Sequence, residues 1–178
     1  MTLAVVVLAA GAGTRYGGAK QLHPVAGRPM LERVLAAARD SGIEERVVVL
    51  GAHAESVLGA VDLQGARAVV SDRWRAGQAG SLTDGLAAVE GEAALVVLGD
   101  GPELDSEALR RVAAARMPTR PEEALAADYG AGRSHPVLLP RPVWAALPLT
   151  GETPGRSIPV RLVDCSDLRP PGDVDHAD

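Results

Sequence analysis

The chain has 178 residues, enough for one domain with its own hydrophobic core. Its 18 Lys and Arg are outnumbered by 23 Asp and Glu, and the net charge of −5 argues against a general nucleic-acid or membrane-surface binder. The single cysteine, Cys165, excludes a disulfide framework and a cysteine-based zinc site, and no apolar run reaches the roughly 20 residues of a membrane span.

The first predicted element is a buried strand at Leu3–Leu8, a continuous apolar run. No basic residue precedes this short apolar run, so we expect no signal peptide and a cytoplasmic protein. Helix-like segments and apolar runs then alternate. This alternation predicts strands at Arg46–Leu50, Ala66–Val70 and Ala94–Leu98, and helices from Pro29 to a C-cap at Gly42, at Ala54–Leu58, at Gly80–Val89 and from a cap at Asp105 or Ser106 to Arg116.

The pattern is weaker beyond Met117. It predicts strands at Leu125–Tyr129, His135–Leu139 and Val160–Val163, a short helix at Val143–Leu147 and a Gly/Pro-rich loop at Thr150–Pro159. Aromatic residues make up only 2% of the chain and Phe is absent, so Ala, Val and Leu must form the core, as suits a parallel sheet covered by helices. We therefore expect a three-layer α/β fold with a mostly parallel sheet, one antiparallel strand in the C-terminal half, a single domain over residues 1–178 and a tail that frays from about residue 170.

A glycine-rich loop follows the first strand and carries Arg15 and Lys20. Loops of this kind wrap backbone N–H groups around phosphates, and their cations neutralise the charge. The loop fits two well-known motifs poorly. A dinucleotide fingerprint would need a glycine where Tyr16 stands, and a P-loop would need Ser or Thr where Gln21 follows Lys20. A tight turn with solvated cations is the plain alternative.

Asp100 follows the strand predicted at Ala94–Leu98. In open α/β sheets, ligands lie beyond the carboxyl ends of the strands, so Asp100 should lie near the glycine-rich loop. A carboxylate that holds Mg²⁺ beside cations that bind phosphates is suited to nucleotidyl transfer. Taken alone, Asp100 is equally compatible with a turn or N-cap residue.

Five stretches in chain order resemble the MobA-like nucleotidyltransferases, which include the molybdenum cofactor cytidylyl- and guanylyltransferases. They cover almost the whole chain: Leu-Ala-Ala-Gly-Ala-Gly-Thr-Arg-Tyr-Gly-Gly-Ala-Lys at 8–20, Ser71-x-x-Trp74-x-x-Gly77-x-x-x-Ser81-Leu82, Gly99-Asp100-Gly101-Pro102, Ser134-His135-Pro136-Val137, and Asp167-Leu-Arg-Pro-Pro-Gly-Asp173. The resemblance implies the Rossmann-like nucleotide-diphospho-sugar transferase fold.

The resemblance also implies roles for individual residues. Catalysis would use Arg15 and Lys20 on the triphosphate and Asp100 on Mg²⁺, with Asp167 as the other metal residue. Acceptor contacts would come from His135 and Arg156. The nucleotide would be held by Leu8, Ala9, Ala10, Gly11, Gly13, Gly80, Ser81 and Leu82. Trp74 would stack on the base or pack against the sheet.

The family transfers a nucleoside monophosphate to a phosphorylated acceptor and releases pyrophosphate. Ala10 matches the cytidylyl members, so the resemblance favours CTP as donor and molybdopterin carrying molybdenum as acceptor, with no nucleic-acid or membrane partner. A sugar-phosphate or alcohol-phosphate nucleotidyltransferase and a catalytically weak nucleotide-binding module remain open as alternatives.

Three positions depart from the family pattern. Gly101 replaces a Gln or Met, Ser71 replaces an Asn, and Arg169 stands where the terminal motif has an aspartate suited to a metal. An arginine would repel a cation. Asp167 or Asp164 could serve instead if the alignment slips by a residue or two. Of the remaining polar residues, His23 and His53 are expected at the surface.

Overall fold

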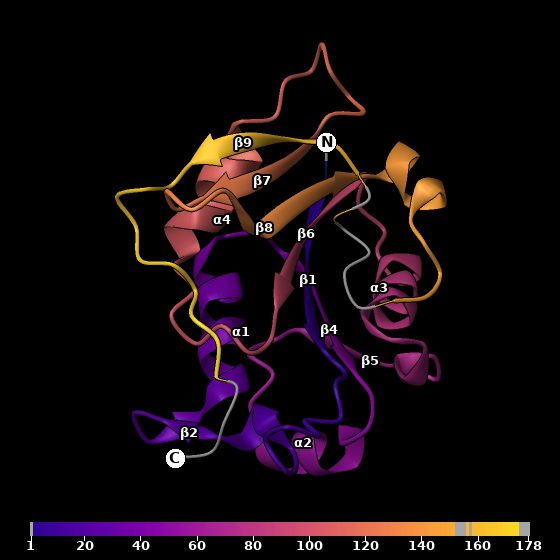
Figure 1. The fold of residues 1–178 in the computed structure, drawn as a ribbon, viewed down its shortest axis with the longest axis vertical. Helices are drawn as coiled ribbons and strands as arrows, with labels where there is room; N and C mark the ends of the chain where they lie inside the picture. Colours follow the sequence, from indigo (N-terminus) through magenta and orange to yellow (C-terminus); the bar gives the residue numbers. More distant parts are fainter. Residues whose placement is uncertain (1, 152–155, 157, 175–178) are drawn as a thin grey trace.

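In the computed structural model, which describes residues 2–151, 156 and 158–174, a seven-stranded sheet forms the centre of the molecule (Figure 1). The strands run in the order β5-β4-β1-β6-β8-β7-β9. Their bounds are β1 Leu3–Ala9, β4 Glu45–Leu50, β5 Arg67–Val70, β6 Ala93–Leu98, β7 Ala124–Asp128, β8 Arg133–Pro140 and β9 Val160–Asp164. Strand β8 is antiparallel to both of its neighbours, and the other pairs are parallel. The mostly parallel α/β sheet predicted from the sequence is confirmed.

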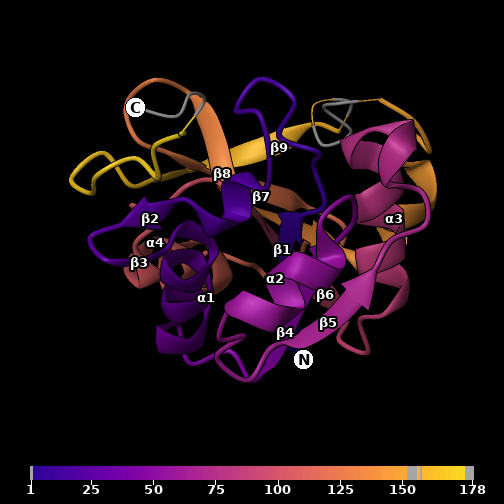
Figure 2. The same ribbon diagram turned by 90° about the horizontal axis from the view of Figure 1, so that it is seen from below.

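Helices cover both faces of the sheet and give it three layers (Figure 2). Helices α1 (Met30–Asp40), α2 (Ala54–Ala60) and α4 (Ser106–Ala114) pack on one face against Val5 and Val7. Helix α3 (Gln78–Ala87) packs on the other face. Because side chains alternate along a strand, the neighbouring residues of β1 point toward α3. The buried core consists mainly of Ala, Val and Leu, as the composition predicts.

Several short elements differ from the sequence-based expectation. Pro29 does not lie in the first helical turn: it ends a small hairpin of β2 (Pro24–Val25) and β3 (Arg28–Pro29) and is the N-cap of α1. The hairpin turn has Ala26 and Gly27 at φ values of 49° and 80°, as a type I′ turn requires. The helix expected at 143–147 is instead the 3₁₀ helix η3 (Arg141–Ala146), and two more 3₁₀ turns are η1 (Lys20–Leu22) and η2 (Trp74–Ala76).

The C-terminal segment leaves β9 and runs along the molecule toward β2 (Figure 1). Within this segment, residues 171–173 are held against the rest of the molecule. Pro171 is buried, its carbonyl accepts a hydrogen bond of 2.9 Å from the N–H of Glu103, and a Cβ added to Gly101 would lie 2.8 Å from the Pro171 side chain. The absence of a side chain at Gly101 therefore makes room for Pro171. Residues 175–178, the end of the predicted tail, lie outside the described residues.

Among the helices of the described residues, none combines the length and apolar character needed to cross a membrane.

Helix α3 approaches the sheet so closely that one of its glycines has no room for a side chain. A Cβ on Gly85 would lie 2.7 Å from Val49 and 2.9 Å from Val6. We expect Gly85→Ala to lower the free energy of unfolding by about 1–3 kcal/mol, since overpacking forces the helix away from the sheet. Gly59 in α2 faces open space and is the matched control, where Ala should raise stability by about 0.5–1 kcal/mol. Urea denaturation of both variants measures the two effects, and equal stabilities would contradict the close packing.

Candidate active site

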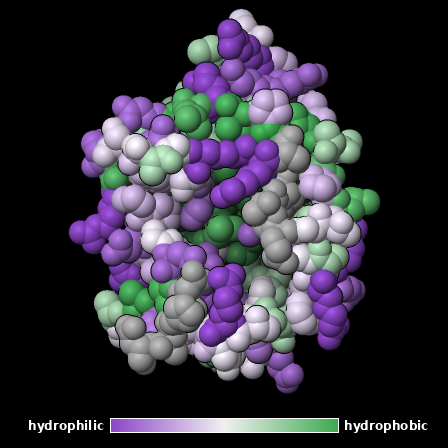
Figure 3. Space-filling view, viewed as in Figure 1, coloured by the Kyte–Doolittle hydropathy of each residue, from purple (hydrophilic) through white to green (hydrophobic). Residues whose placement is uncertain are grey.

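A cavity of about 880 Å³ opens where β1 and β6 end. The glycine-rich loop, the N-terminal turn of α3 and the C-terminal segment surround it. The hollow in the middle of Figure 3 has apolar residues at its bottom and hydrophilic residues along part of its rim. Ten of the residues predicted for the site line this cavity: Leu8, Ala9, Ala10, Gly11, Gly13, Arg15, Lys20, Ser81, Asp100 and Arg156. The cavity therefore gathers the two motifs that the sequence places at neighbouring strand ends.

The glycine-rich loop folds back on itself at Gly13. The carbonyl of Gly13 accepts hydrogen bonds from the N–H groups of Gly17 and Gly18, at 2.8 and 3.2 Å. Gly13 has a φ of 60°, and a Cβ there would lie 2.1 Å from the Gly18 carbonyl oxygen. This position requires glycine for both reasons. Within the described part of the chain, the N–H groups of residues 11–14 donate to no backbone carbonyl, so they are available to an anion in the cavity.

Lys20 joins three distant segments at the rim of the cavity. Its Nζ donates to Oδ2 of Asp100 at 3.1 Å and to Oδ1 of Asp173 at 2.9 Å. Lys20 follows the glycine-rich loop, Asp100 follows β6, and Asp173 lies on the C-terminal segment that Pro171 anchors. Asp173 is the last residue of the terminal motif, but nothing in the sequence alone indicates that it contributes to the site.

The charges of this group change one another's pKa values. Burial and the charge of Asp173 raise the pKa of Asp100, and the Lys20 ammonium only partly opposes them. Burial lowers the pKa of Lys20, but Asp173 and Asp100 outweigh this effect and leave that pKa above its usual value. Lys20 is therefore a cation held between two carboxylates.

Asp167, the other predicted metal residue, does not lie in this group. Its carboxylate forms a two-pronged pair with Arg111, at 2.5 and 2.8 Å, on the outer side of α4. Arg169 does not lie there either: it is exposed and pairs with Glu103 at 3.1 Å. The repulsion of a cation expected from Arg169 is thus absent from the Lys20 group. Among the described residues, no three His, Cys, Asp or Glu side chains gather at one point, so a metal would need ligands beyond Asp100 and Asp173.

The opposite end of the cavity is formed by η2 and the first turn of α3. Trp74, Arg75, Gly77 and Gln78 line it together with Ser81, and the Arg75 guanidinium lies 4.4 Å from the centre of the Trp74 ring. Two predicted residues of this region lie elsewhere. Gly80 packs against the backbone of Arg73, where a Cβ would come within 2.3 Å of the carbonyl oxygen, and Leu82 lies in the core.

The position of Ser71, where the family has Asn, supports the turn that carries Trp74. The Ser71 hydroxyl donates to the Asp84 carboxylate at 2.5 Å, and the guanidinium of Arg73 pairs with the same carboxylate. This network lowers the pKa of Asp84: burial raises it, but the hydrogen bonds from Arg73 and Ser71 outweigh burial. Serine therefore keeps a structural role at this position.

Of the two predicted acceptor residues, only Arg156 lines the cavity. His135 is half-buried behind Gly101, where a Cβ would lie 3.1 Å from its ring. Burial lowers the pKa of His135 to about 4, so the ring is neutral at pH 7, and its Nδ1 has no hydrogen-bond partner in the described structure. The remainder of the loop before Arg156, residues 152–155, lies outside the described residues.

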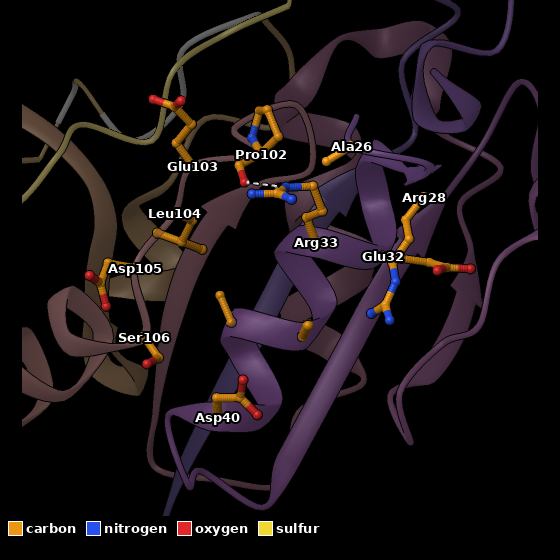
Figure 4. A pocket seen from close by; sticks show the side chains of 12 residues that line it. Ala26, Arg28, Glu32, Arg33, Asp40, Pro102, Glu103, Leu104, Asp105 and Ser106 are labelled. Atoms are coloured by element: carbon orange, nitrogen blue, oxygen red, sulfur yellow. Dashed lines mark hydrogen bonds between the residues drawn. The ribbon is translucent and has the colours of Figure 1, made fainter. Parts of the chain in front are cut away.

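A second, smaller cavity of about 450 Å³ lies between α1 and the Pro102 loop (Figure 4). Its charged side chains have both signs and include Arg28, Glu32, Asp40 and Glu103. Figure 4 shows Arg33 reaching across it, with Nε donating to the Pro102 carbonyl at 3.1 Å. This bond connects α1 to the loop that carries Asp100. The residues around the smaller cavity therefore help to hold the loop that carries Asp100.

Comparison with known proteins places the chain in one family. A model of the MobA-like NTP transferase domain matches residues 5–164. Nicotine blue oxidoreductase of Paenarthrobacter nicotinovorans is 34% identical over 185 residues, which cover 96% of this chain and 90% of that protein. The bifunctional protein GlmU of Azotobacter vinelandii is 39% identical over 125 residues, but the match spans only 27% of GlmU.

Two solved structures of one protein show the same arrangement. Rv0371c of Mycobacterium tuberculosis H37Rv is 30% identical, superposes with a TM-score of 0.83, and covers 99% of this chain and 94% of its own. Its complex with manganese is 29% identical with a TM-score of 0.78, covering 92% and 88%. Since the family model and a full-length relative both span nearly all of the sequence, the chain belongs to the MobA-like NTP transferase family.

Proposed function

We propose that the chain is a divalent-metal-dependent nucleotidyltransferase that moves a nucleoside monophosphate, with CTP as the favoured donor, to a phosphorylated acceptor and releases pyrophosphate. The observation that carries this proposal is the Lys20–Asp100–Asp173 group beside a loop with open N–H groups. Cations, N–H groups and paired carboxylates around one cavity suit a triphosphate with its metal. Catalysis would consist of positioning and charge stabilisation.

The carboxylates of Asp100 and Asp173 fit a divalent cation. A single ammonium nitrogen already contacts an oxygen of each, so both oxygens can surround one small cation. Mg²⁺ commonly takes one or two carboxylates and completes its shell with phosphates and waters. We therefore assign the second ligand to Asp173 instead of Asp167. When bound, Mg²⁺ would neutralise charge at the α-phosphate and favour attack by the acceptor.

The residues of this chain have separate tasks in the proposed reaction. The loop N–H groups and Arg15 would hold the triphosphate. Lys20 would leave the carboxylates and stabilise the departing pyrophosphate, since phosphate oxygens replace the carboxylates as its partners. Trp74 and Ser81 line the part of the cavity suited to the base, where an aromatic face and a hydroxyl are available. Arg156 remains the candidate contact to an acceptor phosphate.

The choice of CTP and of molybdenum cofactor as acceptor rests on the opening motif, in which Ala10 matches the cytidylyl members. Ala10 lines the cavity and its carbonyl accepts from the N–H of Ala52 at 3.2 Å. A side chain larger than alanine at this position would narrow the cavity. Sugar phosphates and alcohol phosphates are the alternative acceptors.

A second candidate function comes from the relative named nicotine blue oxidoreductase. An oxidoreductase would transfer a hydride, for which a nicotinamide cofactor is the usual source. The glycine-rich loop lacks the third glycine of the dinucleotide fingerprint, because Tyr16 occupies that place. Reduction of a dye with NADH or NADPH, in the absence of any nucleoside triphosphate, would favour this candidate.

The direct test is pyrophosphate release from each of the four nucleoside triphosphates with Mg²⁺, with and without molybdenum cofactor. We expect release from CTP that requires both the metal and the cofactor. Release from CTP only with a sugar phosphate or alcohol phosphate would change the acceptor and keep the reaction. Binding of nucleotide without release under any of these conditions would favour a nucleotide-binding module.

Substitutions can test which aspartate of the terminal motif, Asp173 or Asp167, is a metal ligand. Asp173→Asn should lower kcat at least about tenfold and weaken Mn²⁺ binding, since a carboxamide is a poorer ligand. Asp100→Asn should lower kcat at least about a hundredfold. Asp167→Asn is the matched control and should leave both unchanged, because Asp167 pairs with Arg111 away from the cavity. The reverse order of effects, with Asp167 essential, would overturn the assignment.

The raised pKa of Asp100 predicts a pH dependence. Asp100 must be ionised to hold a cation, so kcat/KM should fall as the pH drops through its pKa, which lies above the usual value. Asp173→Asn removes a negative charge that raises this pKa, and the acid limb should therefore move to lower pH. A pH–rate profile of the residual activity measures the shift, and an unmoved acid limb contradicts the coupling.

A further inference from the structure

One buried side chain connects the beginning of the glycine-rich loop to its end. Gln21 follows Lys20 in η1 and is only 6% exposed. Its Nε2 donates to two backbone carbonyls, those of Ala9 at 2.6 Å and Gly11 at 3.1 Å. Its Oε1 is buried without a hydrogen-bond partner in the described structure. Two carbonyls accept from the nitrogen, so the orientation of the amide is determined.

The carbonyls of Ala10 and Ala12, which Gln21 does not contact, have donors of their own. The N–H of Ala52 donates to the carbonyl of Ala10 at 3.2 Å, and Nε2 of His53 lies 2.9 Å from the carbonyl oxygen of Ala12. A carbonyl only accepts, so that nitrogen of His53 carries the proton. Every carbonyl from residue 9 to residue 12 is therefore held by a donor. His53, expected to be a surface residue, takes part in holding the loop.

Because the peptide unit is planar, these carbonyl contacts also determine the direction of the loop N–H groups. In a trans peptide the C=O and the N–H of the same unit point in opposite directions, and the only cis peptide of the described structure lies at His135–Pro136. When Gln21 holds the carbonyl of Gly11, it therefore directs the N–H of Ala12 away from itself. That N–H is one of those without a backbone acceptor in a loop that lines the cavity.

We propose that Gln21 is the positioning residue of the glycine-rich loop: it keeps the carbonyls of Ala9 and Gly11 turned away from the bound triphosphate, and so presents the loop N–H groups to its phosphates. Without these two donors the carbonyls are free to rotate toward the cavity, where their negative ends would repel the phosphate oxygens. The buried, unpaired Oε1 costs stability, which a side chain kept only for packing would avoid. The proposal rests on the proposed function.

The test measures binding of CTP and of CMP by equilibrium dialysis without metal. Gln21→Met keeps the side-chain volume but has no hydrogen-bond donor, and should weaken the binding of CTP at least about tenfold. The binding of CMP should weaken less, because CMP has fewer phosphate oxygens that contact the loop. Gln64→Met is the matched control, since Gln64 contacts Arg39 at the surface far along the chain, and should bind both nucleotides as the wild type does. Circular dichroism melting shows that each variant is folded.

Gln21→Glu distinguishes positioning from mere packing. The introduced carboxyl can donate to a carbonyl only when it is protonated, so CTP affinity should recover as the pH falls and be lost as the pH rises through its pKa. A purely structural role would leave the pH profile of CTP binding the same as that of the wild type.

A measurement on the wild type avoids the question of folding. The side-chain amide protons of Gln21 should exchange slowly in NMR spectra and shift when tripolyphosphate is added. Free exchange, or wild-type CTP affinity in folded Gln21→Met, overturns the proposal while leaving the transferase function intact. A wild type that binds neither CTP nor tripolyphosphate would instead remove the proposed function itself.

Discussion

Two carboxylates at the rim of the cavity need a cation, and Lys20 supplies it. The ammonium lies between Asp100 and Asp173 and so ties the glycine-rich loop, the end of β6 and the C-terminal segment to one point. Taking any one of these charges away would leave the others partly buried and poorly compensated. The free protein thus keeps the lysine that we propose to bind phosphate together with the carboxylates that we propose to bind the metal, because each satisfies the other's charge. A triphosphate with its cation offers both sets of groups new partners at the same time, which favours binding of the two together over binding of either alone.

The path of the C-terminal segment depends on a residue that departs from the family pattern. Gly101 lacks the Gln or Met of other members, and the buried ring of Pro171 occupies the space that such a side chain would fill. With Pro171 in place, Asp173 reaches Lys20 and Asp167 stays on the outer side of α4 with Arg111. Taken separately, Gly101 lacks a side chain and Arg169 lacks a carboxylate that the family pattern has. Together they are compatible with one rearranged site. In the proposed metal site, Asp173 takes the place of the aspartate that the motif lacks at position 169.

Local patterns in the sequence were enough for the sheet and for most helices, because an apolar run, a cap such as Asp105 and a helical period each act over a few residues. They were also enough to bring Lys20 and Asp100 together, since carboxyl ends of neighbouring parallel strands meet at one edge. The hairpin at 24–29 was missed because its turn places Ala26 at positive φ, which alanine rarely adopts. The choice between Asp167 and Asp173 depends on how the tail packs on Gly101, and no local pattern contains that contact.

Gln21 shows a further limit of sequence-based reasoning. In the sequence, Gln21 is one more polar residue beside Lys20, and it stands where a P-loop motif would need Ser or Thr. Its importance appears only when η1 folds under the loop and brings the amide to carbonyls ten and twelve positions earlier. The residues that touch a ligand are easier to find in a sequence, because their chemistry is specific to the ligand. The residues that aim a backbone are harder to find, since any side chain with a donor at the right place could do so, and that place is set by the whole fold.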